Sequence, residues 1–203
     1  DFVLKIRRPP RSTLLPYTTR FRSEAEGQIG EYAKSMLTFA AVGALQSILG
    51  ESINYVNAEF MAQEKGIELG FATLPNSGYN NKLCVKIVTE NASFSVAGTI
   101  FEENDQRIVD LNGFKTDFKP KGKMIIFKNK DIPGVIAKIS GILAHNKINI
   151  ADFRLGRDGS GYALAVILVD EFIGKAVLDE LNAYEACIFA RKRGVVDSAI
   201  KKG

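Results

Sequence analysis

Hydrophobic and polar positions divide this chain into two parts with different periods. Between residues 25 and 66 the apolar residues recur at helical spacing, and between 67 and 112 they alternate with polar residues as in antiparallel strands. The pattern predicts two helices, 25–50 and 52–66, followed by several strands, which together make a small α+β domain. The residues expected to face inward are Tyr32, Met36, Phe39, Ala40, Gly43, Leu45, Ile48 and Leu49 in the first helix, and Val56, Phe60 and Met61 in the second.

The remainder of the chain, from 123 to 193, repeats a strand, helix, strand, strand, helix, strand order. The strands are expected at 124–127, 148–155 and 162–169 and around Ala186, Ile188 and Ala190, and the second helix at 173–181. This βαββαβ order is the split βαβ, or ferredoxin-like, arrangement. The first helix of this unit has one apolar face, formed by Val135, Ile136, Ile139, Ile142 and Leu143.

The junction from Asp131 to Gly134 joins the first strand of this unit to its first helix. Proline has a fixed φ that suits the first turn of a helix, and glycine allows close approach of another group. The first N–H groups of the helix, at 134–137, have no partner within the helix and favour an anion such as a carboxylate. Asp131 lies just outside the helix and can hold a cation beside that anion. A carboxylate next to an ammonium group describes a free amino acid.

Composition narrows the range of partners. The 203 residues are 46% hydrophobic and 25% charged, and no apolar run approaches the roughly 18 to 20 residues that cross a bilayer. Residues 1–23 contain six basic residues and one acidic residue, so the net charge of +4 comes from this stretch, and the rest of the chain has a net charge of −1. We therefore expect a soluble protein that binds neither nucleic acid nor membrane. Two scattered cysteines, Cys84 and Cys187, indicate reduced thiols in the cytoplasm, and with the single histidine they do not form a metal site.

Three stretches are expected to lie outside regular structure. Residues 1–23 show no usable period and resemble translated sequencing-adapter DNA, with a disordered basic arm or a targeting peptide as alternatives. Residues 114–122 are lysine-rich and predict a solvated linker or, together with Arg107, an anion site. Residues 196–203 are expected to form a C-terminal tail.

Several motifs of the last unit resemble the ACT domain, a small-molecule sensor of amino-acid metabolism. They are the signature at 129–136, the start of the second strand at 148–151, and the glycine-rich hairpin that precedes 163–166. The region 29–193 resembles, more narrowly, the C-terminal half of bacterial D-3-phosphoglycerate dehydrogenases. That resemblance implies a helix at 24–50 that closes a missing substrate-binding domain, an intervening regulatory domain at 51–120 and an ACT domain at 121–195.

The resemblance also implies ligands. The family's ACT domain binds L-serine at a dimer interface for feedback inhibition, and Asn129 stands where relatives often carry an aromatic residue or histidine. The intervening domain of relatives carries an anion site proposed for phosphorylated substrate. The implied effector residues are Asn129, Asp131, Pro133, Gly134, Val135 and Asn149, and the implied anion-binding residues are Arg107, Lys115 and Lys119.

Catalytic motifs of the family are not found in this sequence. The parent enzymes bind NAD at a Gly-x-Gly-x-x-Gly turn and use an Arg, Glu and His set, whereas this chain lacks that turn and has only His145, expected at the surface. We expect no cofactor in this chain, no catalysis by it alone, and a homo-oligomer formed through ACT edge strands. The alternatives are the regulatory portion of an L-serine dehydratase and a free-standing amino-acid sensor.

Overall fold

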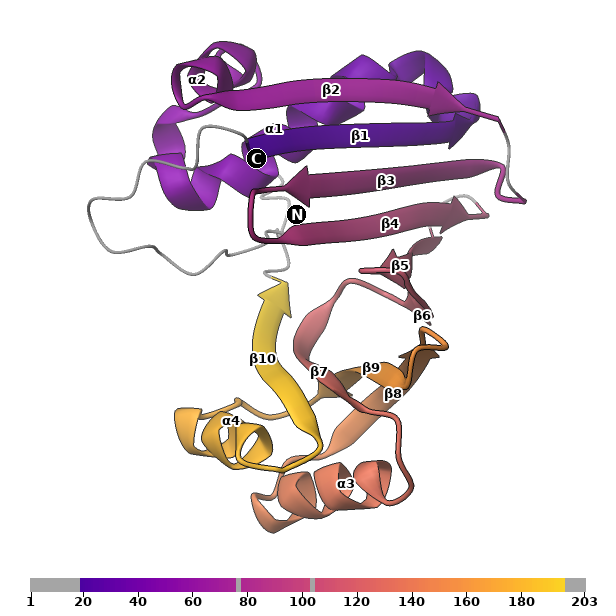
Figure 1. The fold of residues 1–203 in the computed structure, drawn as a ribbon, viewed down its shortest axis with the longest axis vertical. Coiled ribbons are helices and arrows are strands. Elements are labelled where there is room, and N and C mark those ends of the chain that lie inside the picture. Colours follow the sequence, from indigo (N-terminus) through magenta and orange to yellow (C-terminus); the bar gives the residue numbers. More distant parts are fainter. Residues whose placement is uncertain (1–18, 76–77, 103–104, 196–203) are drawn as a thin grey trace, which may run out of the picture. The chain divides into compact units, whose positions relative to one another are not determined.

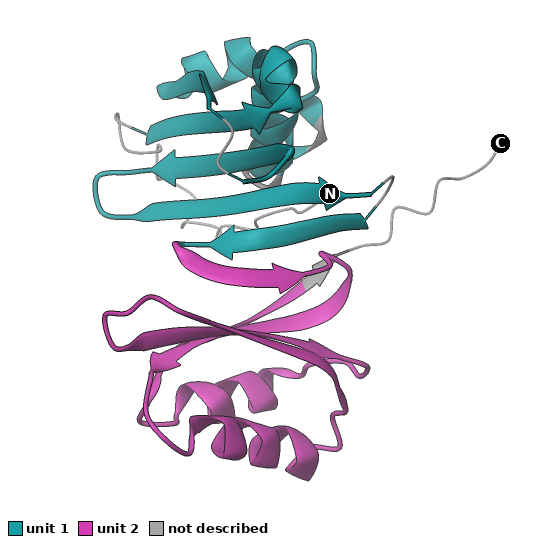
Figure 2. Cartoon of the chain, turned by 90° about the vertical axis from the view of Figure 1, so that its right-hand side faces the viewer, with its two compact units in different colours: residues 1–112 teal, residues 113–203 magenta. Residues whose placement is uncertain are grey.

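The computed structural model describes residues 19–75, 78–102 and 105–195, which form two compact units. The first unit is Asp1–Asn112 and the second is Gly113–Gly203 (Figure 2). The C-terminal tail expected at 196–203 and residues 1–18, 76–77 and 103–104 lie outside the described residues.

The first unit is a sheet with helices on one face (Figure 1). Its strands follow the order β2-β1-β3-β4-β5, with β1 parallel to β2 and the other neighbours antiparallel. The parallel pair is joined by a crossover that contains both helices, as parallel strands require. The elements are β1 (Thr19–Gly27), a 3₁₀ turn (Gln28–Tyr32), α1 (Ala33–Leu49), a second 3₁₀ turn (Gly50–Ser52), α2 (Ala58–Glu64), β2 (Ile67–Leu74), β3 (Asn81–Val88), β4 (Ser93–Phe101) and β5 (Asp105–Leu111).

Strand β1 corrects the interpretation of residues 1–23 as a tail outside the fold. Residues 19–23 form its first half and pair with β2 on one side and β3 on the other. Phe21 is 1% exposed and belongs to the core that α1 and α2 cover. The alternation of Thr19, Phe21 and Ser23 with arginines is a strand period, buried on one face only. The expected tail is therefore wrong for residues 19–23.

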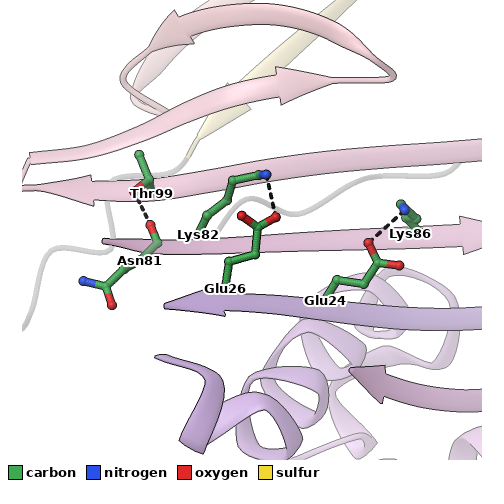
Figure 3. Close-up of polar contacts among 6 residues, drawn as sticks. All are labelled: Glu24, Glu26, Asn81, Lys82, Lys86 and Thr99. Carbon is green, nitrogen blue, oxygen red and sulfur yellow. Dashed lines mark hydrogen bonds and ion pairs between the residues drawn. The ribbon is translucent and has the colours of Figure 1, made fainter. Parts of the chain in front are cut away.

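Ion pairs join β1 to β3 on the face of the sheet opposite the one that buries Phe21 (Figure 3). Lys82 Nζ lies 2.6 Å from Glu26 Oε1, and Lys86 Nζ lies 2.9 Å from Glu24 Oε2. Glu26 and Lys82 are directly opposite in the register, whereas Lys86 reaches Glu24 diagonally. The hydrogen bond to Glu24 raises the pKa of Lys86. These pairs match the register of the two strands.

The helices of the first unit bury small residues rather than the aromatic residues expected from the sequence. Tyr32, Phe39, Val56 and Phe60 are exposed, and Phe39 packs against Tyr55 with ring centroids 4.8 Å apart. Small side chains let a helix backbone approach the sheet closely, and the aromatic residues lie on the outer side. Asn57 is the N-cap residue of α2, although its side chain makes no cap hydrogen bond. The buried helix residues are Ala33, Leu37, Ala41, Ala44, Leu45, Ala58 and Ala62.

The second unit confirms the ferredoxin-like α+β prediction. Its sheet has the order β10-β7-β9-β8, with all neighbours antiparallel, and α3 and α4 pack against it. Ile136 was expected on the inward apolar face of α3 but is 50% exposed. The elements are β6 (Phe114–Phe118), β7 (Gly122–Lys130), α3 (Val135–His145), β8 (Ile150–Arg157), β9 (Tyr162–Val169), α4 (Lys175–Asn182) and β10 (Cys187–Val195).

Strand β6 corrects the expected linker at 114–122. Phe114 and Phe118 are 2% and 0% exposed, because alternate residues of this strand face inward. β6 lies against the end of β8, where a Cβ on Gly156 would stand 2.4 Å from the Lys115 carbonyl oxygen. Lys115 is therefore an exposed position of a packed strand, and Lys119 and Lys121 are exposed residues that follow it.

We predict that Phe21→Ala destabilises the protein by about 3–5 kcal/mol, the usual cost of removing a buried aromatic side chain. Arg20→Ala on the same strand should change the free energy of unfolding by less than about 1 kcal/mol, because its ion pair with Glu68 is exposed. Urea unfolding of the full chain measures both values. Equal effects of the two substitutions would place residues 19–23 outside the fold.

We also predict that Gly156→Ala destabilises the second unit by about 1–3 kcal/mol, because the added Cβ meets backbone of β6. Gly141→Ala is the matched control: its Cβ would meet nothing within 4 Å, and alanine favours the middle of a helix by roughly 0.5–1 kcal/mol. Thermal unfolding should therefore show opposite shifts for the two variants. A tolerated Gly156→Ala would show that β6 does not pack there.

Candidate functional site

A pocket of about 370 Å³ lies in the second unit between the first turn of α3 and the sheet. Five of the six predicted effector residues line it: Asn129, Asp131, Pro133, Gly134 and Val135. The sheet and the inner side of α3 contribute apolar residues, and one further charged residue stands at its edge. These lining residues, which were not predicted as site residues, include Ile139, Leu155, Arg157, Ala163 and Ala165.

The register of three strands builds the floor of this pocket. Ala163 of β9 is paired with Asn129 of β7 and with Arg157 of β8, so the three residues form one row across the sheet. In a row of antiparallel partners the side chains point to the same face. The central residue of the row is alanine, so space remains between the two polar side chains.

Asn129 supplies a buried acceptor to the pocket. Its residue is 3% exposed, and Nδ2 donates a hydrogen bond of 2.6 Å to the carbonyl oxygen of Lys130. The carbonyl oxygen of Lys130 can only accept a hydrogen bond, so the Asn129 amide atom that faces it is the nitrogen. The other amide atom is therefore the oxygen. The Oδ1 atom is buried and has no hydrogen-bond partner in the described part of the chain. Such an unsatisfied oxygen costs roughly 1–3 kcal/mol, which a ligand N–H or O–H can recover.

The start of α3 supplies donors opposite this acceptor. Gly134 has a left-handed φ of 88° and is the N-cap residue, and Pro133 lies before it rather than in the first turn, where it was expected. The first helical bond runs from the N–H of Lys138 to the carbonyl of Gly134. The N–H groups of 135–137 thus have no acceptor within the helix, and they favour an anion.

Asp131 carries the negative charge of the pocket, and it is paired. Arg157 Nε lies 3.0 Å from Asp131 Oδ2, with side-chain exposures of 67% and 29%. Sequence reasoning missed Arg157 because its position beside Asp131 depends on the pairing of β8 with β9. The signal in the sequence was a basic residue at the end of a strand, directly before a glycine-rich turn.

Asn149, the sixth predicted effector residue, does not line the pocket of this chain. Its Nδ2 donates to Asp170 Oδ2 at 2.7 Å, and its backbone N–H donates to Glu171 Oε2 at 2.6 Å. Asn149 precedes β8, an edge strand of the four-stranded sheet. Its contact with an effector stays a prediction that requires a second copy of the unit.

The predicted anion-binding residues lie in both units. Arg107, on β5 of the first unit, donates from Nε to Asp105 Oδ2 at 3.0 Å. Lys115 and Lys119 belong to the second unit, and both are exposed. A shared anion site of these three residues stays a prediction.

Other reactive groups are placed as packing or surface residues. Burial raises the pKa of the Cys84 thiol and raises that of Cys187 to about 11, so neither is an activated nucleophile. His145 is exposed in the last turn of α3, as predicted. Within the described ranges, no cluster of three or more His, Cys, Asp or Glu residues is arranged to hold a metal ion. No helix in the described part of the chain is long and apolar enough to cross a membrane.

Comparison with known proteins assigns both units to families. Residues 18–112 match the family model of the D-3-phosphoglycerate dehydrogenase intervening domain, and residues 123–186 match that of the ACT domain. The first match begins at β1 and includes α1. It therefore places α1, which was expected to close a missing substrate-binding domain, within the same unit as the strands that it covers.

Relatives named D-3-phosphoglycerate dehydrogenase match most of the chain. The Bacillus subtilis protein is 33% identical over 160 residues, which are 77% of this chain and 30% of the relative. The Archaeoglobus fulgidus protein is 33% identical over 73% of the chain, and the Synechocystis protein is 31% identical over 77%. Each of these two matches covers 29% of the relative.

The order of the two matched domains agrees with the two units of the structure, and the chain spans about 30% of the length of these relatives. The chain belongs to the D-3-phosphoglycerate dehydrogenase family and corresponds to its C-terminal regulatory part, an intervening domain followed by an ACT domain.

Proposed function

We propose that the second unit binds a free α-amino acid, L-serine, in the pocket at the start of α3. The observation that carries the proposal is the buried Oδ1 of Asn129, an acceptor with no partner among the described residues, in the same pocket as the free N–H groups of 135–137. An acceptor set and a donor set in one pocket are complementary to an ammonium and a carboxylate on one carbon.

The ammonium group of serine is assigned to the side of the pocket with Asp131 and Asn129. Asp131 offers charge, and Asn129 offers a lone pair that the protein leaves unused. The carboxylate is assigned to the first turn of α3, where N–H groups and the helix dipole both favour an anion. Val135 and Gly134 then act through their backbone, and Pro133 shapes the approach to the helix.

We also propose a homo-oligomer, which the place of Asn149 supports. β6 covers the C-terminal end of β8 at Gly156, whereas Asn149 lies at the opposite end of this edge strand. An unpaired edge favours association with another strand. We assign Asn149 to the closing contact with serine bound to a second copy, which makes the ligand part of the interface.

At the level of the enzyme, we propose feedback inhibition of NAD-dependent 3-phosphoglycerate oxidation by serine, in the cytoplasm. Binding that favours one arrangement of the oligomer needs a coupling free energy of only about 1–3 kcal/mol. NAD belongs to the catalytic part of the family and not to this chain. Arg107, Lys115 and Lys119 are retained as candidates for a phosphorylated ligand. The named relatives support this over the dehydratase and free-standing sensor alternatives.

We predict that isothermal titration of the full chain with L-serine shows saturable binding. The full chain is needed because a version that starts at residue 24 lacks half of β1. Glycine and L-alanine, which lack the hydroxyl group, should bind more weakly. Absence of binding at millimolar L-serine would contradict the assignment of serine.

We predict that Asp131→Asn weakens L-serine binding by about tenfold or more, because it removes the negative charge opposite the ammonium group. Asp179→Asn is the matched control, since it makes the same change of charge at an exposed ion pair of α4 outside the pocket. Titration of the two variants measures the difference. Equal affinities would show that the ammonium group does not lie beside Asp131.

A further inference from the structure

Arg157 has no assigned role in the proposed binding of an amino acid, although it lines the same pocket. It ends β8 in the row that Ala163 and Asn129 continue, and its Nε lies 3.0 Å from Asp131 Oδ2. Its side chain is 67% exposed, whereas that of Asp131 is 29% exposed. The arginine therefore lies on the solvent side of the pair.

The backbone on both sides of this ion pair is held in place. The N–H of Asp131 donates to the carbonyl of Gly161 at 2.9 Å, which ties the approach to α3 to the β8–β9 turn. In that turn, Asp158 Oδ1 accepts from the N–H groups of Ser160 and Tyr162. With both main chains fixed, the exposed side chain of Arg157 is the part of the ion pair that has room to move.

We propose that Arg157 makes the pocket selective for zwitterions: it neutralises Asp131 in the empty pocket and turns to the carboxylate of the ligand when the ligand's ammonium group takes its place. This inference rests on the proposed function and adds the rule by which ligands are chosen. Arginine suits this role because its planar fork binds a carboxylate through two parallel N–H donors.

Charge balance explains the selectivity. Without a ligand, the pair of Asp131 and Arg157 has no net charge. A bound zwitterion keeps the net charge at zero, because its ammonium group meets Asp131 and its carboxylate meets Arg157. An amine alone would leave the guanidinium without a partner, and a carboxylate alone would leave Asp131 without one. Asp131 is the more buried member, so leaving its carboxylate without a cation is unfavourable, and an amine has to displace Arg157 from Asp131 without offering the guanidinium a new anion. Both incomplete ligands are therefore rejected, although each fits half of the site.

The test uses three ligands of similar size and the same configuration: L-serine, L-serinamide, in which an amide replaces the carboxylate, and L-glycerate, in which a hydroxyl replaces the ammonium group. Each is titrated by calorimetry into the full-length wild-type chain and into Arg157→Gln, Arg157→Lys and Arg154→Gln. Arg154 is the matched control, because it forms an ion pair with Asp152 on the same strand and does not line the pocket. Unchanged thermal unfolding verifies that each variant is folded.

We expect the wild type to bind L-serine at least about tenfold more tightly than either incomplete ligand. In Arg157→Gln, serine binding should weaken by about tenfold while serinamide binding strengthens, because Asp131 is then free for an amine. Arg157→Lys should restore part of the preference, and Arg154→Gln should match the wild type.

Opposite changes in the affinities for L-serine and L-serinamide distinguish this role of Arg157 from simpler ones. Serine and serinamide both binding more weakly in Arg157→Gln would indicate support of the fold, and both binding more tightly would indicate a competitor for Asp131. Either result, or no change, overturns the proposal while leaving amino-acid binding intact. If the wild type binds neither L-serine, glycine nor L-alanine, the proposed function is wrong and the zwitterion rule falls with it.

Discussion

The register of β7, β9 and β8 is the constraint on which the candidate site depends. It brings Asn129, Ala163 and Arg157 into one row and leaves a small residue between two polar ones. A slip of one residue in any of these strands would turn its member of the row to the other face of the sheet. The buried core beneath α3, which includes Phe127, Ile139 and Leu143, fixes this register, so the packing of the unit also determines the chemistry of its pocket.

Much of the second unit could be predicted from its sequence because its strands and its first helix have clear periods. The first unit was less predictable for physical reasons. Alanine contributes little to an apolar pattern, yet Ala33, Ala41 and Ala44 form the buried side of α1, while the more apolar Phe39 is exposed. At 114–122 the lysine-rich composition predicted a linker, which concealed the inward-facing Phe114 and Phe118 of β6. In β1 the resemblance to adapter sequence outweighed a real strand period.

The parts of the candidate site that neighbouring residues in the sequence form could be predicted. The Pro-Gly junction and the free N–H groups after it follow from neighbouring residues, and so did the choice of Asp131. The ion pair between Asp131 and Arg157 and the unsatisfied oxygen of Asn129 did not, because both depend on which residues lie opposite in the sheet. Those non-local features add a counterion for Asp131 and an unused acceptor to the amino-acid site that the sequence predicts.

The central claim is that an amino acid lies between the amide of Asn129 and the first turn of α3. Nuclear magnetic resonance of the ¹⁵N-labelled chain during a titration with L-serine tests it most directly. We expect the signals of the Asn129 side-chain amide and of the backbone amides of 135–137 to shift together and to saturate at one serine concentration, while the signals of the α4 amides stay in place. Shifts confined to other residues, or none at saturating serine, would contradict it.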